Sequence, residues 1–226
     1  VAPFLYIFYP YHFIFASYIL LTYFSFNDTI KTNYTIIPKI GLINGVASGY
    51  KPTVTHYKMY KGVIMDIKKV CDLIEARKDE LFTLLSSLVK INSENCGSVG
   101  NEKNCAEYIL SLCKDLGLES EMYSPLDLKD FKSNPDYMEG RDLENRYNVT
   151  AKWKGKENQN KLMIMGHIDT VEIGNRESWE KEPLSGEIAD GKIFGRGACD
   201  DKYALATALF IIKLLKEANL EPKANL

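Results

Sequence analysis

A histidine and an aspartate stand two residues apart where an apolar run ends. The run is LMIM, residues 162–165, and Gly166 separates it from His167 and Asp169. Residues two apart in an extended chain project to the same side, so Asp169 can contact one ring nitrogen of His167 and leave the other facing outward. Such a carboxylate is the usual neighbour of a metal-bound histidine. On its own, however, the pair fits a hydrogen-bonded structural histidine with a helix-capping aspartate better than a metal ligand.

A second group of acids follows in GRGACDDK, residues 195–202. Asp200 and Asp201 stand between a glycine-rich strand end and an apolar helix, where one carboxylate could coordinate a metal while its neighbour faces another direction. Acids at a helix N-terminus are also favoured by capping and by the helix dipole. Cys199 is most simply a small buried residue. The order of the features favours a catalytic or metal-binding role over a purely structural one. An apolar strand comes first, followed by G-H-x-D-T-V, a hairpin and D-D-K.

The elements that would position these residues alternate between helix and strand. Apolar spacing predicts a helix from Asp66, its expected N-cap, to Ile91, a second over 101–117 closed by Gly117, and a buried one over 201–218. The predicted strands are 118–123, 147–155 and 161–167, with an irregular loop over 124–146 and a type I′ hairpin at Asp190-Gly191. Because LMIM is apolar throughout, we expect a buried interior strand. The prediction is an α/β fold: a layered, mostly parallel sheet with flanking helices and functional groups at the carboxyl ends of its strands.

Composition excludes several classes of function. The chain has 226 residues, 46% of them hydrophobic and 26% charged, and a net charge of −2. These values are typical of a globular protein and give no reason to expect nucleic acid or an anionic membrane as partner. The five cysteines form no C-x-x-C pair, which favours reduced thiols and a cytoplasmic location.

Residues 1–64 differ from the rest. Residues 1–27 contain no charged side chain, and tyrosine and phenylalanine are concentrated before position 61. The segment is long enough for a membrane anchor, which needs about 20 apolar residues. It also fits translated upstream DNA, because AT-rich sequence encodes these residue types, or an unusual soluble segment. We take Met65 as the expected functional start, which divides the chain into 1–64 and the body 65–226.

The two motifs together resemble a known family. From Met65 to Leu226 the sequence is similar to the zinc-dependent amidohydrolases and exopeptidases that include acetylornithine deacetylase, succinyl-diaminopimelate desuccinylase, aminoacylase and carboxypeptidase G. The resemblance also covers SWEKEPLSGEIADGKIFGRG, with Trp179 and Pro183 in familiar places. It implies the zinc-peptidase type of α/β catalytic domain, here as its N-terminal half and incomplete at the C-terminus.

The resemblance also implies roles for individual residues. His167 would bind one zinc, Asp169 would orient it as a catalytic residue, and Asp200 would bridge two Zn²⁺ ions, often through a cis peptide to Asp201. Co²⁺ or Mn²⁺ could substitute. A water between the ions would attack an amide bond of an N-acyl amino acid or a short peptide. The full-length protein could form a homodimer through a lid domain that this chain lacks.

The sequence departs from the family pattern at two points. Tyr203 stands where the family usually has glycine after the motif lysine. The family's Glu-Glu pair, a further acid and a late histidine have no counterpart up to Leu226, and His12 and His56 lie in the divergent segment. We therefore expect this chain alone to bind zinc poorly and not to turn over. The alternative is a membrane-tethered, non-catalytic binding domain that retains the fold, and a membrane partner would require residues 1–27 to be genuine.

Overall fold

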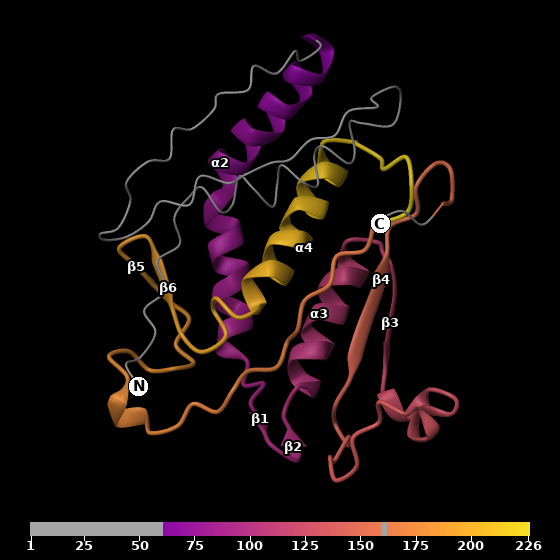
Figure 1. Cartoon of the computed structure of the whole chain (residues 1–226). Helices are drawn as coiled ribbons and strands as arrows, with labels where there is room; N and C mark the ends of the chain where they lie inside the picture. Colours follow the sequence, from indigo (N-terminus) through magenta and orange to yellow (C-terminus); the bar gives the residue numbers. More distant parts are fainter. Residues whose placement is uncertain (1–60, 160–161) are drawn as a thin grey trace, which may run out of the picture.

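The computed structural model describes residues 61–159 and 162–226, with side chains described from Cys71 onward. The predictions for residues 1–60, including the membrane anchor, lie outside these residues. Helices and short strands alternate along the described chain (Figure 1). The α-helices are α2 (Lys61–Lys90), α3 (Lys103–Asp115) and α4 (Lys202–Glu217), and the strands are β1 (Asn95–Cys96), β2 (Val99–Gly100), β3 (Glu119–Tyr123), β4 (Asn148–Lys152), β5 (Glu187–Ala189) and β6 (Lys192–Phe194). No helix in this part of the chain is both long and apolar enough to cross a membrane.

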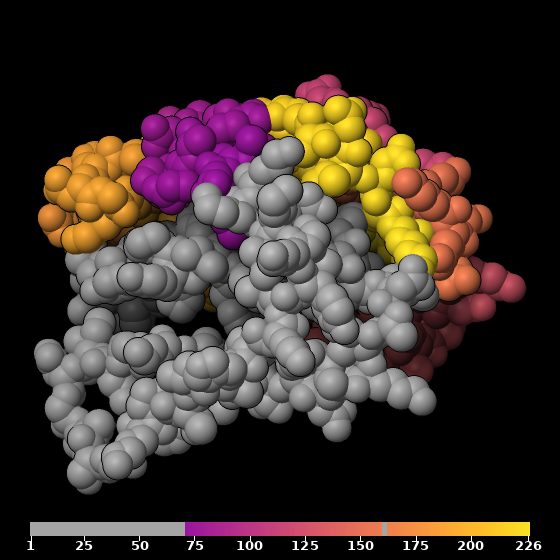
Figure 2. Space-filling view, turned by 90° about the horizontal axis from the view of Figure 1, so that it is seen from above, coloured from indigo at the N-terminus to yellow at the C-terminus, as the bar shows by residue number. Residues whose placement is uncertain are grey.

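The core lies mainly between α2 and α4, which run side by side in Figure 1 and whose surfaces adjoin in Figure 2. The apolar stripe predicted on α2 is buried at Leu81, Leu85 and Leu88. The residues of α4 that complete this core include Phe210, Ile211, Leu214 and Leu215. Both helices are therefore confirmed, and α4 is buried nearly all round, as its sequence indicated.

The predicted start of the first helix is wrong. Asp66 lies inside α2, which begins at Lys61, so it is not the N-cap. The helix is interrupted instead at Arg77, whose φ of −122° and ψ of 15° are not helical. An aspartate before an apolar stripe marks a helix start only if the preceding residues leave the helix, and here they continue it.

The middle of the chain forms a helix packed on a two-stranded sheet. The helix α3 is closed by Gly117, as predicted, because its positive φ of 64° lets the Leu118 N–H return to the carbonyl of Cys113. Antiparallel β3 and β4 pair from Glu119 opposite Lys152 to Tyr123 opposite Asn148, and α3 covers them (Figure 1). Between the two strands runs the irregular loop, which contains the 3₁₀ turns η1 (Pro125–Asp127) and η2 (Phe131–Ser133).

The predicted interior strand is not a strand in the structure. Residues 162–169 form no regular secondary structure and belong to no sheet, and Met163 and Met165 are 80% and 81% exposed. The sheets among the described residues are antiparallel pairs, and the parallel pairing there is an isolated bridge between Glu94 and Thr170. The mixed α and β character is confirmed, whereas the layered, mostly parallel sheet is not seen in the described chain. An apolar run becomes a buried strand only where other strands lie beside it.

The hairpin between β5 and β6 is confirmed and leads to a first prediction. Asp190 and Gly191 have φ values of 50° and 70°, as a type I′ turn requires. A Cβ added at Gly191 would contact no other atom within 4 Å, so only backbone conformation opposes a side chain there. We expect Gly191→Ala to lower the free energy of unfolding by about 1 kcal/mol, measured by urea denaturation. Asp190→Asn is the control and should change little, because Asn-Gly suits this turn equally well; equal losses from both variants would contradict the assignment.

Candidate metal centre

The two motifs meet at His167. Its Nδ1 lies 3.0 Å from the backbone carbonyl oxygen of Asp169 and 3.1 Å from Oδ1 of the same residue. Its Nε2 lies 2.9 Å from Oδ1 of Asp200. The carbonyl and both carboxylates can only accept, so each ring nitrogen faces an acceptor, and Nε2 is the nitrogen that faces the exposed carboxylate of Asp200. The structure thus brings His167, Asp169 and Asp200 together across 33 residues of sequence.

Two opposing effects act on the pKa of His167, burial of the ring and the acceptors around it. Burial lowers the pKa of His167, but hydrogen bonds to Asp200 and to the Asp169 carbonyl, with the charges of both carboxylates, outweigh it and raise the pKa. The side chain of Asp200 is 84% exposed, so this carboxylate remains accessible to a cation. The arrangement combines an oriented imidazole with an open carboxylate.

Asp201 lies against the other motif, beside Gly166 and His167. The peptide bond between the two aspartates is cis, in agreement with the family pattern. The carboxylate of Asp201 accepts a hydrogen bond from the backbone N–H of His167. Gly166 makes room for it, because a Cβ there would lie 2.9 Å from Oδ2 of Asp201. Burial raises the pKa of Asp201, while the bond from His167 lowers it in part.

The segment between β6 and α4 is held in place at Arg196. Trp179 stacks on the guanidinium of Arg196, 4.7 Å from ring centre to Cζ, and its indole N–H donates to the carbonyl of Ile173. The carbonyl of Pro183 accepts from the N–H of Arg196 at 2.7 Å. Trp179 and Pro183, which match the family pattern, therefore hold the segment that leads from β6 to Asp200.

Lys202 anchors the start of α4 from inside the core. Its side chain is fully buried, and Nζ donates to the backbone carbonyls of Leu88 (2.9 Å) and Ile91 (2.8 Å) at the end of α2. Burial lowers its pKa. The helix begins at Lys202 even though Tyr203 replaces the family's glycine. The D-D-K motif contains this lysine, but the motif does not reveal its role, because its partners lie more than 100 residues away.

The donor types suit zinc, but their number is small. An imidazole nitrogen and a carboxylate oxygen are ordinary zinc ligands, and two ligands of a tetrahedral zinc lie about 3.3 Å apart, close to the 2.9 Å between Nε2 and Asp200. Asp169 already points at Nδ1. Among the described residues, no cluster of three or more His, Cys, Asp or Glu side chains could hold a metal ion. These residues therefore fit as part of a metal site that needs further ligands.

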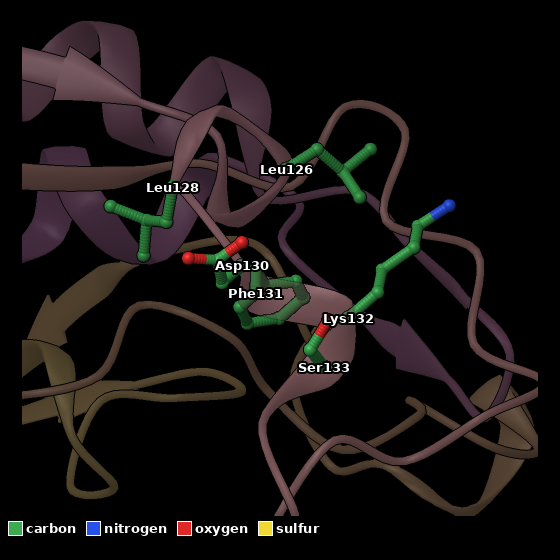
Figure 3. Close-up of a pocket in the computed structure, with 6 residues that line it drawn as sticks. All are labelled: Leu126, Leu128, Asp130, Phe131, Lys132 and Ser133. Atoms are coloured by element: carbon green, nitrogen blue, oxygen red, sulfur yellow. The ribbon is translucent and has the colours of Figure 1, made fainter.

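A shallow pocket elsewhere is not part of this site. It lies in the loop between β3 and β4 (Figure 3), and its lining residues are Leu126, Leu128, Asp130, Phe131, Lys132 and Ser133. None of them belongs to the two motifs. The candidate site is defined by its side chains and not by this cavity.

Comparison with known proteins agrees with the motifs. Residues 163–226 match the model of peptidase family M20/M25/M40. An uncharacterised metallohydrolase of Methanocaldococcus jannaschii is 33% identical over 69% of this chain and 35% of its own length. A Beta-Ala-Xaa dipeptidase of Lactobacillus delbrueckii subsp. lactis is 31% identical over 69% of this chain and 30% of its own length. A succinyl-diaminopimelate desuccinylase of Wigglesworthia glossinidia brevipalpis is 38% identical over 33% of this chain and 20% of its own length.

These matches identify the chain as a member of the metallohydrolases. The chain belongs to peptidase family M20/M25/M40. The sequence resemblance to that group of enzymes is thereby confirmed. The chain spans about a third of the length of the first two relatives and a fifth of the third.

Proposed function

We propose that the complete protein containing this chain is a metal-dependent hydrolase that cleaves an amide bond of an N-acyl amino acid or a dipeptide. The observation that supports it most is the orientation of His167, with Nδ1 on Asp169 and Nε2 on the exposed carboxylate of Asp200. This is the arrangement that a metal-binding imidazole requires. The names of the matched relatives, a dipeptidase and a desuccinylase, support an amide substrate.

The residues of this chain would each have a defined task. His167 and Asp200 would bind a pair of zinc ions, Asp169 would keep the Nδ1 proton in place, and Asp201 would hold the backbone at His167. The zinc pair would supply Lewis-acid polarisation of the amide carbonyl and lower the pKa of a water to about 7. A general base and the remaining ligands would come from outside the described residues. The predicted parallel sheet, completed by further strands, would carry them on neighbouring strand ends.

The test is metal content and hydrolysis in the complete protein. We expect about two Zn²⁺ per chain by elemental analysis, and hydrolysis of N-acetyl or N-succinyl amino acids or of dipeptides. Chelation should abolish the activity, and Zn²⁺, Co²⁺ or Mn²⁺ should restore it. Residues 65–226 expressed alone should bind zinc weakly and not turn over, because two ligands are fewer than a zinc site takes. Hydrolysis that survives complete metal removal, or a complete protein with no affinity for divalent metals, would contradict the proposal.

A further inference from the structure

We infer that Asn95 is a positioning residue of the candidate metal centre, which holds Asp169 so that His167 presents Nε2 to the metal. The inference rests on the proposed function, since it concerns the same site. Nδ2 of Asn95 donates to Oδ2 of Asp169 at 3.1 Å, from 74 residues away in the sequence. The other carboxylate oxygen of Asp169, Oδ1, contacts Nδ1 of His167. A chain of contacts therefore runs from Asn95 through Asp169 and His167 to Asp200.

The backbone places Asn95 beside Asp169 independently of its side chain. The N–H of Asn95 donates to the carbonyl of Thr170 at 2.7 Å, and the N–H of Thr170 donates to the carbonyl of Ser93 at 2.9 Å. Ser93 adds a bond from its hydroxyl to the carbonyl of Ile168 at 2.6 Å. This parallel pairing fixes the segment that carries Asp169 against the start of β1. The amide of Asn95 thus approaches a carboxylate whose backbone is already held.

The chemistry of the contact requires a donor at position 95. Both oxygens of an ionised carboxylate only accept, and Oδ1 of Asp169 is already used by the ring. The amide N–H of Asn95 fixes Oδ2 and with it the rotation of the carboxylate. Without that donor, Asp169 would turn toward water, and the ring would be held by the Asp169 carbonyl alone. The contact of Oδ1 with Nδ1 would weaken, and the ring would be held less firmly in the orientation that turns Nε2 toward Asp200.

A nearby asparagine provides a matched control. Oδ1 of Asn92 accepts from the N–H of Glu94 at 2.9 Å, so this side chain stabilises the same loop through the backbone. Asn92→Ala should weaken the loop without reaching Asp169. Asn95→Ala removes the donor to Asp169. Asn95→Asp has nearly the same shape and replaces the donor by an acceptor, so it separates loss of the donor from loss of packing.

The first experiment uses the complete protein without metal. Long-range ¹⁵N–¹H spectra of ¹⁵N-histidine-labelled protein report which ring nitrogen carries the proton, at a pH where the ring is neutral. The signals of His167 are assigned by their loss in His167→Gln. We expect the same share of the proton at Nδ1 in the wild type and in Asn92→Ala, and a shift toward Nε2, which faces the acceptor Asp200, in Asn95→Ala and Asn95→Asp. A wild-type proton position in both Asn95 variants, or the same shift in Asn92→Ala, would overturn the inference.

The second experiment measures metal affinity by competition with a chelating dye for Zn²⁺. Loss of a residue that directly orients a ligand typically weakens metal binding 10- to 100-fold. Asn95 acts one residue further out, so we expect a loss of about threefold to tenfold in Asn95→Ala, a larger one in Asn95→Asp and none in Asn92→Ala. Equal affinities in all three variants would contradict the inference. If the wild type binds no metal, the proposed function fails, whereas the proton position still tests Asn95.

Discussion

In the complete protein, Asp200→Asn is expected to lower kcat/KM for the proposed amide hydrolysis by about a thousandfold and to leave the free energy of unfolding almost unchanged. The carboxylate is 84% exposed, so little of the folded structure depends on it. Its one described contact with the motif histidine is Oδ1 to Nε2 of His167 at 2.9 Å. An amide keeps the shape but loses the negative charge that would hold a cation. A bound metal contributes several kcal/mol to transition-state stabilisation, and about 4 kcal/mol corresponds to a factor of a thousand.

The matched control makes the same chemical change ten residues earlier. Asp190 is exposed at the tip of the hairpin between β5 and β6. Asp190→Asn should therefore retain wild-type metal content, kcat/KM and stability. Steady-state kinetics, elemental analysis and urea denaturation of the three proteins complete the comparison. An Asp200→Asn protein with full metal content and activity would remove Asp200 from the site, and equal losses in both variants would mean that the effect is general.

Local sequence signals predicted most of the helices and turns. The stripe through Leu81, Leu85 and Leu88, the glycine cap at Gly117 and the Asp190-Gly191 turn depend on residues at most a few positions apart, and all are present. The exception is Asp66, where a plausible cap was overridden by preceding residues that continue the helix. Local patterns thus determine the type of an element better than its ends.

Burial of the apolar run could not be predicted from its own residues. LMIM is apolar enough for a buried strand, yet Met163 and Met165 are exposed, and the nearest parallel pairing is that of Glu94 with Thr170. A strand becomes interior through neighbours that can be far away in the sequence. The run alone predicts a buried strand, and the described chain places no strand beside it.

The candidate site could be predicted only in part, because some of its contacts join segments that are far apart in the sequence. Sequence motifs identified His167, Asp169 and Asp200, whose contacts the structure now gives, while their roles at a metal stay predictions. Asn95 and Lys202 were assigned no role, because their partners lie 74 and more than 100 residues away. An asparagine in a loop and a lysine at a helix start have many ordinary uses. Only the pairing of distant segments brings both residues into contact with the segments that carry the candidate site.

Lys202→Met is expected to destabilise the fold by about 3 kcal/mol and to weaken metal binding as a consequence. The ammonium of Lys202 is fully buried and donates to the carbonyls of Leu88 and Ile91. Carbonyls at the end of a helix have no partner within it, and a positive charge there is favoured by the helix dipole. Methionine fills the space but cannot donate, so both carbonyls lose a charged donor at about 1.5–3 kcal/mol each, although the Leu88 carbonyl keeps the N–H of Ile91. The variant no longer buries a charged ammonium group, and this gain offsets part of the loss of stability.

Lys213→Met is the control on the same helix. Lys213 is partly exposed and pairs with Glu80 at 2.8 Å, and such surface pairs contribute about 1 kcal/mol or less. Urea denaturation should therefore separate the two variants by about 2 kcal/mol. Because Lys202 directly follows the aspartates of the site, only its variant should also lose Zn²⁺ affinity, measured below the denaturation midpoint. Equal stability of the two variants would show that the buried bonds to α2 do not hold the start of α4, and unchanged affinity in Lys202→Met would show that Asp200 is positioned without them.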